Sequence, residues 1–207
     1  MRIEPIAGYV LAGGASSRFG KDKALAEMQG QTMLLRTAKL VASVTSAVKI
    51  VSPTAKLAGA EFETAADRWP GEGPLGGILT ALVDAKKQAG EGAAALIVSC
   101  DMPFLTRNWL SFLAGRAAEC GAEAIVPRSA KGWEPLCSCW RVSALELVLP
   151  LFEAGTRKIT DALNVLRVEV LDEKDWKRFD NDGRLFWNMN TLADYEEARR
   201  VLARENC

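Results

Sequence analysis

AALIVS, at residues 94–99, is a near-continuous apolar run. A short run of this kind is typical of a central parallel strand that is buried on both faces of its sheet. The residues that follow, CDMPFL, place Asp101 just beyond the strand and Pro103 at a turn. Ligands of open α/β sheets bind beyond the carboxyl ends of the strands, so we expect Asp101 to face a ligand site.

On both sides of this run, segments with strand and helix patterns alternate along the chain. Thr32 is the expected N-cap of the first helix. Alternation of this kind predicts βαβ units and a mostly parallel sheet. The further strands are expected at 7–12, 48–52 and 122–127, and the helices at 32–44, 76–88 and 106–119.

The pattern changes after about residue 128. An extended stretch, a helix broken near Pro150, a strand and a final helix are expected at 131–141, 142–155, 167–172 and 191–205. Thr191 and Asp194 form a capping-box pattern for the final helix. We therefore predict one α/β domain over residues 1–207, with antiparallel or mixed strands added to the sheet in its last third.

The composition excludes several classes of function. Basic and acidic residues balance at 26 each, so no overall positive charge favours a nucleic acid or a membrane surface as partner. No apolar run approaches the roughly 20 residues that span a bilayer, and the N-terminus has no signal pattern, so the cytoplasm is the expected location. The chain has no histidine, which excludes histidine-based triads and His-ligated zinc.

The five cysteines have scattered spacings that do not resemble a disulfide framework. Cys137 and Cys139 alternate along an expected strand and therefore share one face. That arrangement allows a metal-binding pair, but two buried thiols are the favoured interpretation.

The stretch LAGGASSRFGKDKAL, Leu11–Leu25, leads from the first expected strand into a loop rich in glycine and basic residues. Gly13 and Gly14 let the backbone approach a ligand closely, and successive loop amides can form an anion-binding nest. Arg18 and Lys23 add positive charge. The spacing fits neither the Walker P-loop nor the dinucleotide fingerprint. The loop therefore indicates either a phosphate site or a tight glycine turn with exposed lysines.

Three further segments bear on this choice. DRWPGEGPLGGI, at 67–78, has four glycines and two prolines before a helix; it either points free amides at a ligand or makes a stiff turn. The Asp101 carboxylate suits Mg²⁺ beside a triphosphate, a role we favour over that of a turn residue before a helix. In FWNMNT, at 186–191, Asn188 and Asn190 share one side, and on their own they favour a turn over ligand binding.

Together these motifs resemble the molybdenum cofactor guanylyltransferases of the MobA type. Leu11–Leu25 matches L-A-G-G-x-S-x-R-x-G-x-D-K-A-L, and PGEGPLGGI, SCDMPFL, EPLCSCW and FWNMNTLADYEEA follow in the order of that family over nearly the whole chain. The resemblance implies a Rossmann-like three-layer nucleotidyltransferase fold. It also implies a Mg²⁺-dependent transfer of GMP from GTP to the terminal phosphate of molybdopterin, with release of pyrophosphate.

The resemblance implies roles for individual residues as well. The nucleotide-binding set is Leu11, Ala12, Gly13, Gly14, Lys23, Asp67 and Asp101. Within it, the backbone at residues 11–13 contacts guanine or ribose, Lys23 binds phosphate, Asp67 contacts the nucleoside and Asp101 binds Mg²⁺. The catalytic set is Lys23, Asp101 and Arg18, of which Arg18 holds the leaving pyrophosphate.

On the acceptor side, Asn188 and Asn190 match the asparagines that face the pterin. Ser52 stands where the family often has an asparagine that reaches the nucleotide, so the resemblance carries no such contact over to Ser52. The implied partners are GTP, molybdopterin, proteins that deliver the cofactor and molybdoenzymes that receive the product.

Other functions fit parts of the pattern. The enzyme could use CTP, or transfer a nucleotide to a sugar phosphate. Related cytidylyltransferases have L-A-A-G where this chain has Leu11–Gly14, which favours GTP. From another class, the chain could be a non-catalytic nucleotide-binding or accessory protein. Lys23 and Asp101 argue against that reading, because binding alone does not strictly need them.

Overall fold

The structure is a computed structural model that describes residues 6–13, 23–53 and 61–204. Its strands are β1 Ala7–Leu11, β2 Glu27–Met28, β3 Gln31–Thr32, β4 Ala47–Ser52, β5 Glu63–Ala66, β6 Ala94–Ser99, β7 Ala124–Ser129, β8 Gly132–Trp133, β9 Cys137–Arg141 and β10 Val168–Leu171. Its α-helices are α1 Met33–Ala42, α2 Pro74–Ala89, α3 Arg107–Glu119, α4 Ala144–Glu153, α5 Ile159–Leu163, α6 Glu173–Trp176 and α7 Leu192–Arg204, and its 3₁₀ helices are η1 Lys23–Leu25 and η2 Lys177–Phe179.

Eight of the described strands form one mixed sheet, in the order β10-β7-β9-β6-β1-β4-β5 with β8 paired to β7. β1 lies between β4 and β6 and is parallel to both. β9 runs antiparallel to β6 and to β7, so it enters the middle of the sheet rather than adding to an edge. The predicted α/β fold with a mostly parallel sheet is confirmed, and the antiparallel strand of the last third is internal.

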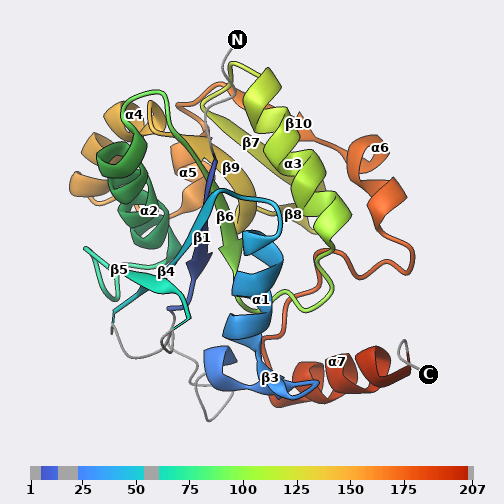
Figure 1. Ribbon diagram of the computed structural model, residues 1–207. Helices are drawn as coiled ribbons and strands as arrows, with labels where there is room; N and C mark the ends of the chain where they lie inside the picture. Colours follow the sequence, from blue (N-terminus) through green and yellow to red (C-terminus); the bar gives the residue numbers. More distant parts are fainter. Residues whose placement is uncertain (1–5, 14–22, 54–60, 205–207) are drawn as a thin grey trace.

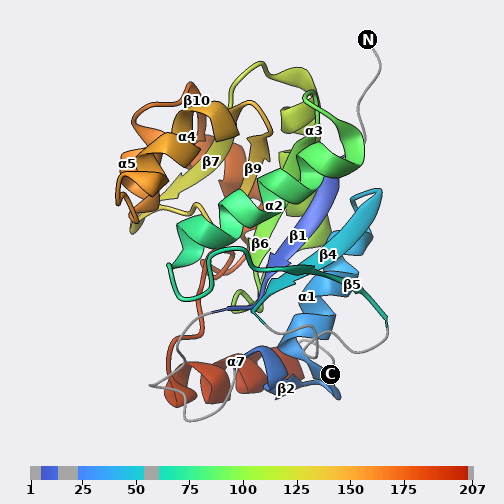
Figure 2. The same cartoon turned by 90° about the vertical axis from the view of Figure 1, so that its left-hand side faces the viewer.

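Helices cover both faces of the sheet, as Figure 1 and Figure 2 show, with α1 and α3 on one face and α2 and α4 on the other. Successive side chains of β1 point to opposite faces of the sheet, so this one strand packs against both helix layers. Tyr9 and Leu11 belong to the core under α2, whereas Val10 and Ala12 belong to the core under α1 and α3. Because each strand residue faces one layer or the other, a short apolar strand contributes to both cores.

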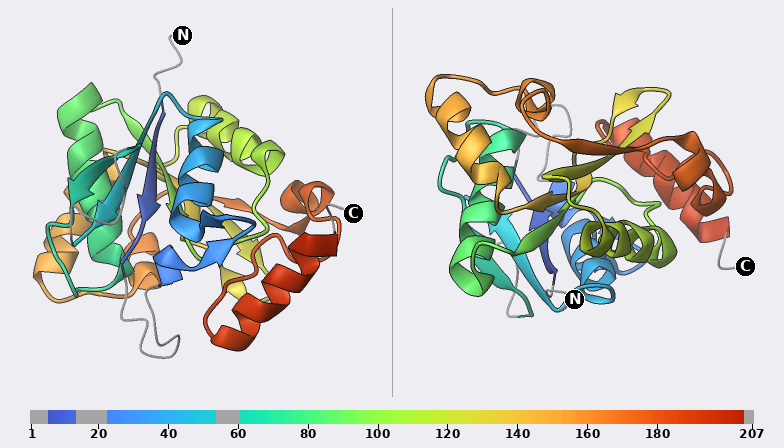
Figure 3. Two further views of the ribbon diagram at one scale, coloured as in Figure 1. Left: turned by 60° about the horizontal axis from the view of Figure 1, so that its bottom comes forward. Right: turned by 90° about the horizontal axis from the view of Figure 1, so that it is seen from above.

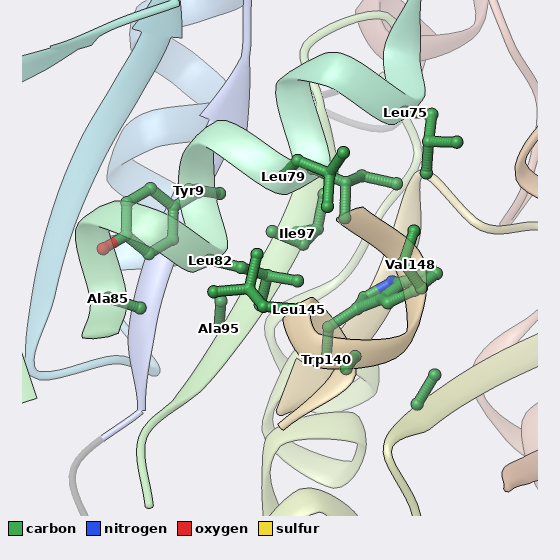
Figure 4. Packing of buried hydrophobic residues seen from close by; sticks show 14 of the residues in the cluster. Tyr9, Leu75, Leu79, Leu82, Ala85, Ala95, Ile97, Trp140, Leu145 and Val148 are labelled. Carbon is green, nitrogen blue, oxygen red and sulfur yellow. The ribbon is translucent and has the colours of Figure 1, made fainter. Parts of the chain in front are cut away.

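The core under α2 and α4 is built from large aliphatic side chains of both helices (Figure 4). Leu79 and Leu82 of α2 meet Leu145 and Val148 of α4 above β6 and β9. Trp140 of β9 lies in the same cluster and is 1% exposed. Burial of this kind is the main source of stability, at about 25 cal/mol for each Å² of apolar surface removed from water.

α7 lies at the end of the molecule toward which β1 points (Figure 1). Its apolar side chains form a small separate cluster with Met28, Met33 and Met189. The β2–β3 hairpin lies beside it (Figure 3), and the Tyr195 hydroxyl donates to the Glu27 carbonyl over 2.5 Å. The final helix therefore lies near the edge of the sheet at which the predicted ligand site is expected. No helix in the described part of the chain has both the length and the apolar character needed to cross a bilayer.

Several predicted elements are confirmed: the central strand, and two helices whose starts are marked by a capping residue. β6 covers the predicted residues 94–99. The Thr32 hydroxyl caps α1 by accepting from the Leu35 amide. At α7, the Asp194 amide donates to the Thr191 hydroxyl over 3.2 Å and the Thr191 amide donates to the Asp194 carboxylate over 2.7 Å, so the predicted capping box is present.

The predicted break near Pro150 is wrong, because α4 continues through that residue to Glu153. Proline removes one helical hydrogen bond, the one that the carbonyl of Glu146 would accept. Glu146 and Pro150 are both exposed, so water can satisfy that carbonyl. Val148 and Phe152 hold the opposite side of the helix in the core. Tertiary packing therefore keeps the helix intact against its local propensity.

Other boundaries moved or were missed. α2 begins at Pro74, two residues before the prediction, because proline is well suited to the first turn of a helix. β7 covers 124–129 rather than 122–127. β5 and α5 were not predicted at all, since β5 has only one buried residue and α5 has only five residues.

Cys137 and Cys139 lie on one face of β9, and both are buried in the core under α3. Burial raises the pKa of the Cys137 thiol to about 12 and raises the pKa of Cys139 as well. The Trp109 indole donates to the Cys137 sulfur over 3.2 Å. Within the described residues no group of three or more metal-ligating side chains occurs. The buried-thiol interpretation is therefore the one that the geometry supports.

Gly8 allows β1 and α1 to pack closely together. A Cβ at this position would lie 2.2 Å from Cγ1 of Val41, a fully buried and stiff side chain. We expect Gly8→Ala to lower the free energy of unfolding by about 1–3 kcal/mol, the usual cost of overpacking a core. Urea denaturation measures this loss. The double variant Gly8→Ala/Val41→Ala should lose less than the sum of its single variants; strict additivity would show that the clash is not the cause.

Candidate functional site

The carboxyl ends of three strands are joined at one edge of the sheet. The Ala12 amide donates to the Val51 carbonyl over 2.9 Å, which links the end of β1 to β4. The Cys100 amide donates to the Leu11 carbonyl over 3.3 Å, which links β1 to β6. These bonds bring the residues that follow each strand, including Gly13 and Asp101, to the same edge.

A cavity of about 400 Å³ opens at this edge. Among its lining residues are Leu11, Gly13 and Asp67 from the predicted nucleotide set. Gly71, Gly73, Pro74 and Gly77 of the predicted glycine-rich segment also line it. Sequence reasoning assigned no role to the other lining residues, which are Val51 and Pro53 at the end of β4, Ser99 at the end of β6, and Leu136 before β9. Ser52 does not line the cavity; it is 1% exposed, and its carbonyl accepts from the Asp67 amide over 3.0 Å.

The backbone bonds also bear on which atoms near β1 are available to a ligand. The amide of Ala12 and the carbonyl of Leu11 are both used in joining strands. The Ala12 side chain is 4% exposed and belongs to the core under α1 and α3, on the far side from the cavity. Leu11 and Gly13 both line the cavity, and the described part of the predicted loop ends at Gly13.

The glycine-rich segment at 67–78 leads into the N-terminus of α2, which borders the cavity. Gly71 and Gly73 both have φ of 84°, a left-handed conformation that glycine adopts without strain. Gly73 is the N-cap and supplies no side-chain bond to the helix. Gly77 faces β1, where a Cβ would lie in ordinary van der Waals contact with Leu11, at 3.4 Å. The uncapped start of a 16-residue helix favours an anion.

The last turn of α4 and the residues that follow it contact this glycine-rich segment. The Glu72 carboxylate, between the two left-handed glycines, accepts from Nε of Arg157 over 2.5 Å. The Arg157 guanidinium lies 4.1 Å from the centre of the Phe152 ring and donates to the Phe152 carbonyl over 2.6 Å. Trp69 packs edge-on against the same ring at 5.4 Å. A segment far along the chain thus fixes the wall of the cavity.

The chain segments that carry the predicted metal ligand and the predicted acceptor-side asparagines are hydrogen-bonded to each other through their backbones. The Met189 amide donates to the Asp101 carbonyl over 2.9 Å. Met189 is fully buried, whereas Asn188 is half-buried and Asn190 is exposed, as expected for an extended segment whose flanking side chains point away from the core. Asp101 is half-buried; it is not among the residues that line the cavity, but it follows the lining residue Ser99 by two positions.

Two predicted residues lie outside the described part of the chain, and a third is described without its side chain. Gly14 and Arg18 lie outside the described residues. Lys23 opens η1, but nothing is described of its side chain. Ala24, next to it, is 2% exposed and belongs to the core under α1. The roles of Gly14, Arg18 and Lys23 therefore stay predictions.

Comparison with known proteins decides the family. The model of the MobA-like NTP transferase domain matches residues 8–169 of this chain. The chain belongs to this family. A molybdenum cofactor guanylyltransferase of Desulfosudis oleivorans is 32% identical over 202 residues and 97% of both chains. A probable molybdenum cofactor guanylyltransferase of Deinococcus radiodurans is 37% identical over 195 residues and 93% of both chains.

The fold of the MobA-like family is confirmed by a solved structure. The crystal structure of molybdopterin-guanine dinucleotide biosynthesis protein A from Archaeoglobus fulgidus superposes with a TM-score of 0.82 at 24% identity, over 96% of this chain and all of the other. The predicted nucleotidyltransferase fold and family are therefore correct, and the protein is a nucleotidyltransferase enzyme.

Proposed function

We propose that this enzyme transfers GMP from GTP to the terminal phosphate of molybdopterin, with Mg²⁺ bound at Asp101. The observation that carries the proposal is a meeting of two regions at one sheet edge: the cavity bordered by the start of α2, and the Asp101 segment bonded to Met189. The names of the relatives at 32% and 37% identity support the same reaction. The proposal takes residues 1–207 as one nucleotidyltransferase domain.

The two regions suit the two substrates. The cavity has apolar walls from Leu11, Val51 and Leu136 and a carboxylate from Asp67, a combination that fits the nucleoside of GTP. The start of α2 favours the negative charge of the nucleotide. Asn188 and Asn190 flank Met189, whose amide binds the Asp101 carbonyl, and they offer amide groups to the pterin-bearing acceptor.

In the proposed reaction an oxygen of the molybdopterin phosphate attacks the α-phosphorus of GTP in line. The new P–O bond forms as the bond from the α-phosphorus to the β-phosphate oxygen breaks, and pyrophosphate leaves. The attacking phosphate is already ionised at neutral pH, so no strong base is needed. Positioning and charge neutralisation dominate. We assign Lys23 to the α-phosphate and Arg18 with the loop amides to the pyrophosphate.

Asp101 fits a divalent cation that is completed by the substrate. Mg²⁺ is usually held by one or two carboxylates together with substrate phosphates and water. Such a cation at Asp101 would take its remaining ligands from phosphate oxygens and water. When bound, such a cation neutralises part of the phosphate charge. The role of Asp101 is to fix its position next to the end of β1.

The test of this function is pyrophosphate release in the presence of Mg²⁺ and molybdopterin, with GTP or CTP as donor. We expect turnover with GTP and little with CTP, and none with GTP when molybdopterin is left out. Turnover with CTP alone would keep the mechanism but refute the assignment of the base. No turnover with either, while GTP still binds, would refute the reaction and favour a nucleotide-binding accessory protein.

A further inference from the structure

Within the described residues, the Asp67 carboxylate is held by hydrogen bonds to one of its two oxygens. Oδ1 accepts from the Trp69 amide over 3.1 Å and from the Thr80 hydroxyl over 3.1 Å. No donor among the described residues, 6–13, 23–53 and 61–204, binds Oδ2. Asp67 is half-buried and lines the cavity, so Oδ2 is the oxygen that remains for a ligand.

Thr80 is placed to control the direction of this carboxylate. It lies in α2, is 2% exposed, and is not itself a lining residue of the cavity. Its hydroxyl donates its single proton to Asp67 and accepts from the Arg68 amide over 3.1 Å. One buried hydroxyl therefore ties both the side chain of Asp67 and the backbone of the next residue to the helix.

We propose that Thr80 is a positioning residue that aims the Asp67 carboxylate into the nucleotide cavity. This inference rests on the proposed function, because it takes Asp67 as a ligand of the GTP nucleoside. Asp67 lies in the loop after β5, and a half-buried loop carboxylate samples several rotamers unless something restrains it. A bond from a rigid element removes that freedom before the ligand arrives and so strengthens binding.

The helix is rigid enough for this purpose. Ile78, Leu79 and Leu82, which surround Thr80 in α2, are fully buried in the core. The same helix also borders the cavity with its N-terminal residues Gly73 and Gly77. α2 therefore sets the distance between the anion-favouring helix start and the Asp67 carboxylate, which are two points of contact for one nucleotide.

If Thr80 had only a packing role, loss of its hydroxyl alone would not weaken GTP binding. Two substitutions distinguish this role from the proposed one. Thr80→Val keeps the volume and removes the hydroxyl. Thr80→Ser keeps the hydroxyl and removes a buried methyl group. We expect Thr80→Val to raise the Kd for Mg²⁺-GTP about tenfold, since it loses a hydrogen bond to a charged group, whereas Thr80→Ser stays close to the wild-type value. Calorimetric titration with GTP measures this without the acceptor.

The melting temperatures of both variants control for a loss of packing. Thr80→Ser removes one buried methyl group, whereas Thr80→Val removes both hydrogen bonds of the hydroxyl, so both melting temperatures should fall, that of Thr80→Val at least as far. If Thr80→Ser weakens GTP binding as much as Thr80→Val does, binding follows packing instead of the hydroxyl and the inference is wrong.

Asp67→Asn and the double variant Asp67→Asn/Thr80→Val complete the test. If Thr80 acts through Asp67, the double variant should bind GTP no more weakly than Asp67→Asn alone. Additive losses would overturn the inference but leave Asp67 as a ligand. Unchanged binding by Asp67→Asn would overturn both the inference and the proposed role of Asp67.

Discussion

Asp101→Asn is expected to lower kcat for pyrophosphate release by at least about 100-fold, the usual loss when a group that stabilises the transition-state charge is removed. The substitution keeps the shape of the side chain but removes the charge that we assign to the metal ion. The backbone bond from Met189 to the residue 101 carbonyl does not involve the side chain and should persist. The fold should therefore remain intact, with a melting temperature within about 3 °C of the wild-type value.

Asp161→Asn is a matched control for this experiment. Asp161 is an exposed aspartate in the first turn of α5, in the element that follows α4. It should keep wild-type turnover, because its carboxylate takes no part in the proposed site. If Asp101→Asn turns over GTP at a near-normal rate with Mg²⁺, the metal assignment is wrong, whatever the control shows.

Trp109→Ala is expected to cause the largest loss of stability, about 3–5 kcal/mol in the free energy of unfolding. Trp109 is fully buried, and its ring centre lies 5.6 Å from those of Phe179 and Phe186 and 5.9 Å from that of Phe112. Its indole also donates to the Cys137 sulfur. Removing the ring leaves a void between α3 and the segment around 179–186. A close-packed core collapses into such a void only in part.

Urea denaturation followed by circular dichroism measures this effect. Trp109→Phe should lose less, about 1–2 kcal/mol, because a phenyl ring keeps most of the contacts with Phe179 and Phe186. It also keeps the experiment informative if Trp109→Ala does not fold. A loss below about 1 kcal/mol in Trp109→Ala would show that the aromatic cluster does not support the fold as described.

The parts of the site that the sequence predicted are those with a local chemical signal. Asp101 directly follows an apolar strand, and ligands of this architecture bind beyond strand ends, so its place at the sheet edge was predictable. The glycines at 71 and 73 predicted a turn before a helix, and the structure has that turn. Thr80 carried no signal of this kind, because a threonine inside a helix is unremarkable until its partner is known.

The contacts that complete the site join residues far apart in the chain. Glu72 binds Arg157, and the Asp101 carbonyl binds the Met189 amide. No periodicity or motif encodes such pairs, since each depends on how the strands are ordered. The order itself was not predictable, because β9 enters between β6 and β7 by antiparallel pairing with both.

The sequence by itself determined the elements whose hydrogen bonds and apolar faces are local: the apolar strand at 94–99, the helix capped by Thr32 and the helix capped by Thr191. Tertiary structure decided the rest. β5 has only one buried residue, and it exists because it pairs with β4 at the edge of the sheet. α4 passes through Pro150 because Val148 and Phe152 are held in the core, where burial outweighs the loss of one hydrogen bond.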